Sequence, residues 1–153
     1  MYNYNNLMKP LIISIIAGLL STTSIAGNVR LTNNKYVTVN VDIKGNKLKA
    51  GSSIEMLISL KPVDGIHINL KPAIELTLDS LSSAALSGTM KIPKGPEYLD
   101  TSSPITQRIL LAKKVKPGNV ALKGMLTYYY CSDKEGWCSK FKQPIEITLT
   151  VDR

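Results

Sequence analysis

The sequence predicts an all-β protein built as one antiparallel β-sandwich domain. Two observations favour this fold class. Apolar residues occupy every second position over several stretches of the chain, which is the period of a strand with one face on a core and the other toward water. Residues typical of turns separate these stretches at spacings of about ten residues, as in sandwich folds.

The first expected strand shows the pattern most clearly, because Val37, Val39, Val41 and Ile43 alternate with polar residues. The same alternation or a comparable apolar run predicts further strands over 54–60, 74–78, 105–112, 120–131 and 145–151. Glycine and proline, which favour turns, occur between the runs at 45–46, 51–52, 62–65, 93–96, 104, 117–118 and 144. One weak helical candidate, 78–87, is rich in Ser and Ala, and we expect a loop or a single turn there.

The N-terminal segment, residues 1–26, has the features of a signal peptide. Lys9 precedes an uncharged apolar run at 11–20, and Ser24 and Ala26 stand where small residues precede a cleavage site. The run is shorter than the roughly 20 residues of a spanning helix, which disfavours the alternative of an uncleaved anchor. We therefore expect cleavage after Ala26, a mature domain over 27–153 without a membrane span, and a periplasmic or secreted location.

The formal net charge is +8, which raises the question of nucleic-acid binding. The basic residues are dispersed, however, and only 113–116 and 140–142 approach clusters. No basic stripe with interleaved aromatic residues is present, so we expect no nucleic-acid partner. A solvated basic surface that favours acidic partners or anionic envelope surfaces is the preferred interpretation.

Cys131 and Cys138 are the two cysteines of the chain, and both lie in the part expected to be exported. An even count at short spacing in an oxidising compartment predicts a disulfide. Closing a loop of about eight residues stabilises a fold by about 2.5 kcal/mol, less than a bond between distant strands would. A short loop suits a bond that opens and closes without unfolding the domain, but many inert disulfides close short loops. The residues alone leave a structural and a redox role open.

The neighbours of the cysteines also leave alternatives open. Asp133 and Glu135 would raise a thiol pKa, whereas Lys134, Lys140 and Lys142 would lower it. The aromatic residues Trp137 and 128–130 either pack the end of the sandwich, or shield the disulfide and offer a docking surface.

The segment 129–138, YYCSDKEGWC, resembles the C-terminal end of the N-terminal periplasmic domain of DsbD, a thiol:disulfide interchange protein. The segment 65–69, GIHIN, is similar to a stretch of the wider DsbD N-terminal-like family. The resemblance implies an immunoglobulin-like sandwich with Cys131 and Cys138 as the catalytic pair. It implies that Cys138 forms the mixed disulfide and Cys131 resolves it, with thioredoxin-like or membrane-embedded thiol:disulfide proteins as partners. The cysteines stand further apart here than in the best-known members, and no cofactor is implied.

His67 is the only histidine, and it lies between Ile66 and Ile68. A structural histidine with a hydrogen-bond partner is favoured over a catalytic one. A metal site of Cys131, Cys138 and His67 would lack a fourth ligand and fits no zinc spacing, so none is expected. The alternative to a redox module is a non-catalytic binding or scaffold module with a fixed disulfide. A metal-delivery protein is disfavoured, because the methionines are scattered.

Overall fold

The structure, a computed structural model, describes residues 28–31, 34–44, 48–80 and 83–153. The predicted signal peptide, 1–26, lies outside the described residues. The described residues form nine strands arranged in two antiparallel sheets. The predicted fold class, an all-β antiparallel sandwich, is confirmed. Within the described ranges, no helix has the length and apolar character needed to cross a membrane.

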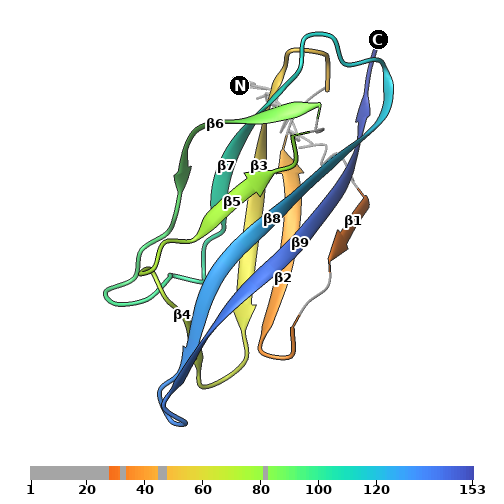
Figure 1. Cartoon of the computed structure of the whole chain (residues 1–153). Helices are drawn as coiled ribbons and strands as arrows, with labels where there is room; N and C mark the ends of the chain where they lie inside the picture. Colours follow the sequence, from red (N-terminus) through yellow and green to blue (C-terminus); the bar gives the residue numbers. More distant parts are fainter. Residues whose placement is uncertain (1–27, 32–33, 45–47, 81–82) are drawn as a thin grey trace, which may run out of the picture.

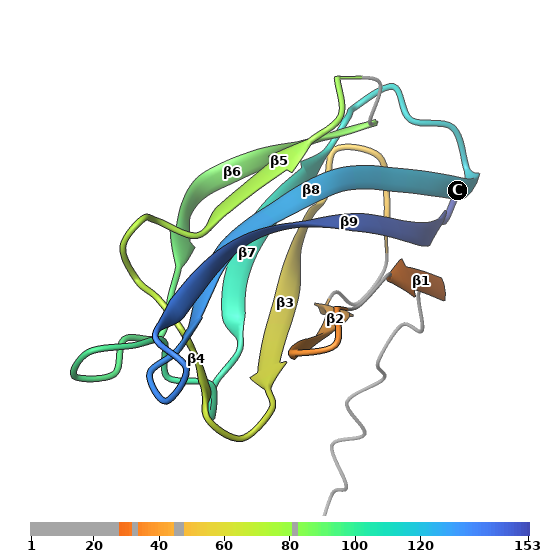
Figure 2. The ribbon, with the colours of Figure 1, turned by 60° about the horizontal axis from the view of Figure 1, so that its bottom comes forward.

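The two sheets face each other across one core (Figures 1 and 2). The first sheet runs in the order β1 (Asn28–Leu31), β9 (Trp137–Val151), β8 (Gly118–Ser132), β4 (Ile66–Ile68), and β5 (Glu75–Leu78) also pairs with β8. The second sheet runs in the order β2 (Val37–Lys44), β3 (Ser53–Pro62), β7 (Ile105–Leu111), β6 (Ala84–Lys91).

The core follows from the alternation of apolar residues. Along β2 every second side chain is buried, and β3, β7 and β9 repeat this pattern over most of their length. Met56, Ile58, Ile109, Leu126 and Ile147 are fully buried. Burying each such side chain favours folding by about 1.5–3 kcal/mol, so these facing stripes hold the two sheets together.

Pro144 was predicted to be in a turn, but it lies inside β9 opposite Met125. The backbone amide of Asp79 donates to the carbonyl of Lys123, so the backbone groups of odd-numbered β8 residues point away from β9. In an antiparallel ladder, the residues opposite them also point their backbone groups away from the shared ladder. The missing N–H of Pro144 therefore costs no hydrogen bond between β8 and β9.

The segment 78–87 is neither a loop nor a helical turn throughout. Leu78 ends β5, and β6 begins at Ala84. The pairing of β6 with β7 shifts register between Ser87 and Lys91, and Gly88 between them has a positive φ of 70°. No side chain of β6 is fully buried, and its exposure does not alternate with a period of two, so the sequence pattern did not reveal the strand.

Gly124 allows β5 to lie against β8. A Cβ atom at position 124 would come within 2.3 Å of the carbonyl oxygen of Thr77. Leu78 is the ladder partner of Gly124, so a side chain there would push β5 off the sheet. The glycine thus keeps the edge of the first sheet closed beside the long β8–β9 hairpin.

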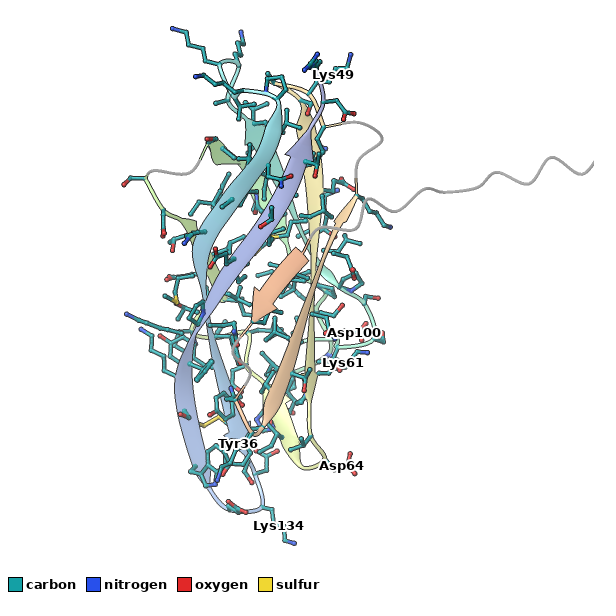
Figure 3. All side chains as sticks on the ribbon, turned by 90° about the vertical axis from the view of Figure 1, so that its right-hand side faces the viewer. Tyr36, Lys49, Lys61, Asp64, Asp100 and Lys134 are labelled. Carbon is teal, nitrogen blue, oxygen red and sulfur yellow. A yellow bond between two sulfur atoms is a disulfide. The ribbon has the colours of Figure 1, made fainter. Side chains whose placement is uncertain are left out.

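β8 and β9 form that hairpin, which runs the length of the sandwich (Figure 1). Its ladder is continuous from Gly118 opposite Val151 to Ser132 opposite Trp137. Figure 3 shows Lys134 at the tip of the hairpin, with Tyr36 and Asp64 at the same end of the molecule. The two cysteines form the second-to-last pair of this ladder, one pair before the tip.

Candidate disulfide site at the tip of the β8–β9 hairpin

Cys131 and Cys138 lie directly opposite each other and form a disulfide, with their Cα atoms 4.0 Å apart. The predicted bond is confirmed. The strands are joined at this end by the turn 133–136, in which the amide of Gly136 donates to the carbonyl of Ser132 at 2.9 Å. Gly136 has a positive φ of 67°, a conformation that glycine adopts without strain. The turn thus brings the two cysteines into one ladder pair.

The two sulfurs share one face of the sheet but not one environment. Tyr130 and Tyr128 point into the core, so Cys131, which alternates with them, points to the outer face together with its partner. Cys131 is nevertheless only 5% exposed, whereas Cys138 is exposed. The difference arises because β4 pairs with β8 on the Cys131 side and places His67 opposite Cys131.

Asn69, just after β4, contacts the buried sulfur. Its side-chain Nδ2 donates a hydrogen bond to Sγ of Cys131 at 3.1 Å. Its backbone amide donates to the carbonyl of Tyr129 at 2.9 Å, and it forms a β-bridge with Tyr98. The backbone of Asn69 is therefore fixed on two sides. Its side-chain Oδ1 is buried and has no hydrogen-bond partner.

His67 lies on the same outer face as Asn69. Its ring stacks on that of Tyr98, with centroids 3.7 Å apart, and its Nδ1 lies 3.4 Å from Oδ2 of Asp133. The Tyr98 hydroxyl donates to the same oxygen at 3.4 Å. Desolvation raises the pKa of the Tyr98 phenol, and the negative charge of Asp133 raises it further. His67, Tyr98 and Asp133 thus form a polar cluster that covers the Cys131 side of the tip.

The aromatic residues of the tip divide between the two faces of the sheet. Trp137 packs in the core-facing layer against Tyr36 and Tyr130, with ring centroids 4.9 and 5.8 Å apart. Tyr128 is fully buried behind them. Of the aromatic residues on β8 and β9 at the tip, Tyr129 shares the face of the cysteines, and there Nζ of Lys140 lies 5.5 Å from its ring centroid. Most of these rings therefore pack the end of the sandwich and do not cover the disulfide.

Both turn carboxylates contact side chains other than the cysteines. Asp133 contacts His67 and Tyr98, and Glu135 accepts a hydrogen bond from the indole N–H of Trp137. The sequence identified these acids as neighbours of the thiols but could not show which groups they contact. Among the described residues, no group of three or more His, Cys, Asp or Glu side chains is placed to hold a metal ion.

Asn69 and Tyr98 were not identified as site residues from the sequence. Alternation does put His67 and Asn69 on one face of a short strand, and this was the available signal. Neither the pairing of that strand with β8 nor the bridge to Tyr98 can be seen in the sequence, because both depend on the sheet order.

The fold and the site together define a β-sandwich domain with a cross-strand disulfide at one end. No protein-family model matches the chain, and no curated protein matches it significantly. Among solved structures, the GAE domain of yeast GGA1 is similar, at 15% sequence identity and a TM-score of 0.42. The match covers 82% of this chain and 100% of that one.

Proposed function

We propose that the chain is an exported redox module that exchanges electrons with partner proteins through Cys131 and Cys138. The observation that carries this proposal is the asymmetry of the disulfide. Cys138 is open to an attacking thiolate, while Cys131 is almost fully covered and held by Asn69. Thiol–disulfide exchange depends on which sulfur an incoming thiolate can reach. In this bond Cys138 is therefore suited to be attacked, and Cys131 is suited to be the leaving thiolate.

The position of the bond supports reversible opening. The ladder between β8 and β9 continues along the whole hairpin, so the strands stay paired when the bond is reduced. Because the disulfide closes a short loop, it contributes only about 2.5 kcal/mol through loop entropy. Opening it exposes no part of the core, since both cysteines project from the outer face.

The exchange proceeds in two balanced steps. A thiolate of a partner dithiol attacks Sγ of Cys138, a partner–Cys138 disulfide forms, and the electron pair of the broken bond goes to Sγ of Cys131. The partner's second thiolate then attacks the partner's first sulfur, which is bonded to Cys138 in the mixed disulfide, and Cys138 leaves as a thiolate. The partner dithiol is thereby oxidised to a disulfide, and the Cys131–Cys138 bond is reduced. The reverse sequence passes the electrons on.

The partners we propose are thioredoxin-like or membrane-embedded thiol:disulfide proteins, in keeping with the resemblance of 129–138 to the DsbD N-terminal-like family. We also propose a periplasmic or secreted location, with removal of residues 1–26. A disulfide persists in such an oxidising compartment. N-terminal sequencing of the exported chain tests this, and Gly27 is the expected first residue.

A mixed-disulfide experiment tests the exchange. The probe is a thioredoxin-class protein that keeps only its first active-site cysteine, activated as its thionitrobenzoate disulfide. The Cys131→Ala variant leaves Cys138 free and should form a stable mixed disulfide with the probe, releasing coloured thionitrobenzoate. The Cys138→Ala variant, with only the covered thiol, should react much more slowly. Trapping through Cys131 instead would reverse the roles, and no trapping in either variant would overturn the carrier function.

One observation favours a second candidate, a binding module with a fixed disulfide. β1 pairs with β9 only from Ile145 to Thr148. Beside the stretch from Cys138 to Lys142, β9 has no strand on that side among the described residues. A free strand edge can take up an extended segment of another protein. A binding module would hold its partner equally well with both cysteines replaced by alanine, whereas the redox module would lose exchange.

A further inference from the structure

Asn69 distinguishes the two sulfurs of the disulfide. Its Nδ2 lies 3.1 Å from Sγ of Cys131, and no described residue donates a hydrogen bond to Sγ of Cys138. A neutral disulfide sulfur is a weak acceptor, so the bond gains little while the disulfide is closed. A thiolate is a far better acceptor, because hydrogen bonds to charged groups are markedly stronger than neutral ones.

We infer that Asn69 is a positioning residue for the exchange, and that its side-chain amide stabilises the Cys131 thiolate when an incoming thiol attacks Cys138. This inference rests on the proposed function. When the Cys131–Cys138 bond breaks, the electron pair moves onto the sulfur that already faces Nδ2 of Asn69. The amide therefore favours departure of Cys131 over departure of Cys138, and it stabilises the same thiolate when Cys131 later attacks the mixed disulfide.

The amide oxygen of the Asn69 side chain, Oδ1, also supports this role. Oδ1 is buried without a hydrogen-bond partner, and leaving a buried acceptor unpaired costs about as much as a lost hydrogen bond. A packing residue with no chemical role would avoid that cost, and unpaired buried groups in folded proteins call for an explanation. A half-turn of the amide would let Oδ1 accept the S–H of a protonated Cys131, so the side chain can satisfy the thiol as well as the thiolate.

The other polar groups around Cys131 are directed elsewhere. His67 on β4, Tyr98 and the turn residue Asp133 contact one another. On β9, the ammonium of Lys140 lies over the ring of Tyr129. Asn69 is thus the described residue that donates a hydrogen bond to this sulfur.

Titration of a single thiol tests the inference. In the Cys138→Ser variant Cys131 is the only cysteine, and its pKa can be read from the ultraviolet absorbance of the thiolate. Replacing Asn69 with Leu removes the donor, and replacing it with Asp keeps the shape but substitutes a carboxylate. We expect Asn69→Leu to raise the pKa of Cys131 by about one to two units and Asn69→Asp to raise it further. Asn119→Asp, at the far end of β8, makes the same charge change and should leave the pKa unaltered.

The same substitutions in the chain with both cysteines should slow reduction by dithiothreitol, because a thiolate of higher pKa leaves more slowly. Near-ultraviolet circular dichroism identifies a variant that fails to fold. If one Asn69 variant does not fold, the pKa of Cys131 in the other Asn69 variant is enough to test the inference. An unchanged pKa of Cys131 in the folded variants would overturn the role of Asn69 and leave exchange at Cys138 standing. A failed mixed-disulfide experiment would instead overturn the exchange itself, whatever the pKa.

Discussion

Cys131 lies directly opposite Cys138 in the ladder between β8 and β9, yet the fold covers one sulfur and leaves the other open. The cause is local. β4 pairs with β8 and places His67 opposite Cys131, whereas β9 has no described strand on its other side beside Cys138. The order of strands in the sheet therefore determines which of the two sulfurs an incoming thiolate can reach.

Alkylation of the reduced protein should show this asymmetry. We expect iodoacetamide to modify Cys138 at least about tenfold faster than Cys131 in the folded domain, because the reagent must reach the sulfur. Peptide mass spectrometry of a time course measures both rates. In denaturant the two rates should converge, and equal rates in the folded domain would contradict the account.

Removal of both sulfurs should leave the fold intact. The Cys131→Ala/Cys138→Ala variant is expected to lose about 2–3 kcal/mol of unfolding free energy, as a short closed loop implies. The core and the β8–β9 ladder do not depend on the bond. Urea denaturation followed by circular dichroism measures the change. A variant that cannot fold would mark the disulfide as a required staple.

Trp137 should matter for stability rather than for access to the disulfide. It packs against Tyr36 and Tyr130 at the end of the core, so Trp137→Ala should lower the unfolding free energy by about 1–3 kcal/mol. The rate at which dithiothreitol reduces the disulfide should stay within about twofold of the original. Tyr129→Ala is the matched control, since Tyr129 shares the face of the cysteines. A large increase in rate for Trp137→Ala would show that the indole shields the bond.

Tyr98 should titrate above the ordinary range of a phenol. Desolvation is the main cause of its raised pKa, and Asp133 adds to it. Since the folded value exceeds the unfolded one, the stability contribution is present below about pH 10 and is lost as the pH rises through the folded pKa. The absorbance difference between the original chain and Tyr98→Phe isolates this group. Asp133→Asn should lower the pKa of Tyr98 only in part, and no change would remove Asp133 from the cluster.

The sequence predicted the regular part of this fold well, because a strand with one buried face has apolar residues at every second position of the sequence. The residues 37–43 and 145–151 alternate without interruption, and both form strands with buried apolar faces. Pro144 was misassigned because a backbone position that points away from the β8–β9 ladder tolerates proline. The segment 78–87 was misassigned because β6 buries no side chain fully and shows no two-residue period. Local signals of this kind cannot show which strand lies beside which.

The site was predictable to the same extent. The spacing of Cys131 and Cys138 indicated the disulfide, because it depends only on one hairpin. The contact of Asn69 with Cys131 spans two strands whose neighbours are set by the overall topology. The bridge that brings Tyr98 to this side of the sheet is also long-range.

The reduction potential of the Cys131–Cys138 disulfide in the purified domain decides whether this bond carries electrons or only holds the hairpin together. Equilibration with a thiol buffer of known potential, followed by alkylation and mass analysis, gives the value. A redox module requires a potential above about −300 mV, within reach of thioredoxin-class partners, and this is the result we expect. A potential well below about −300 mV would make the bond a structural one and contradict the account.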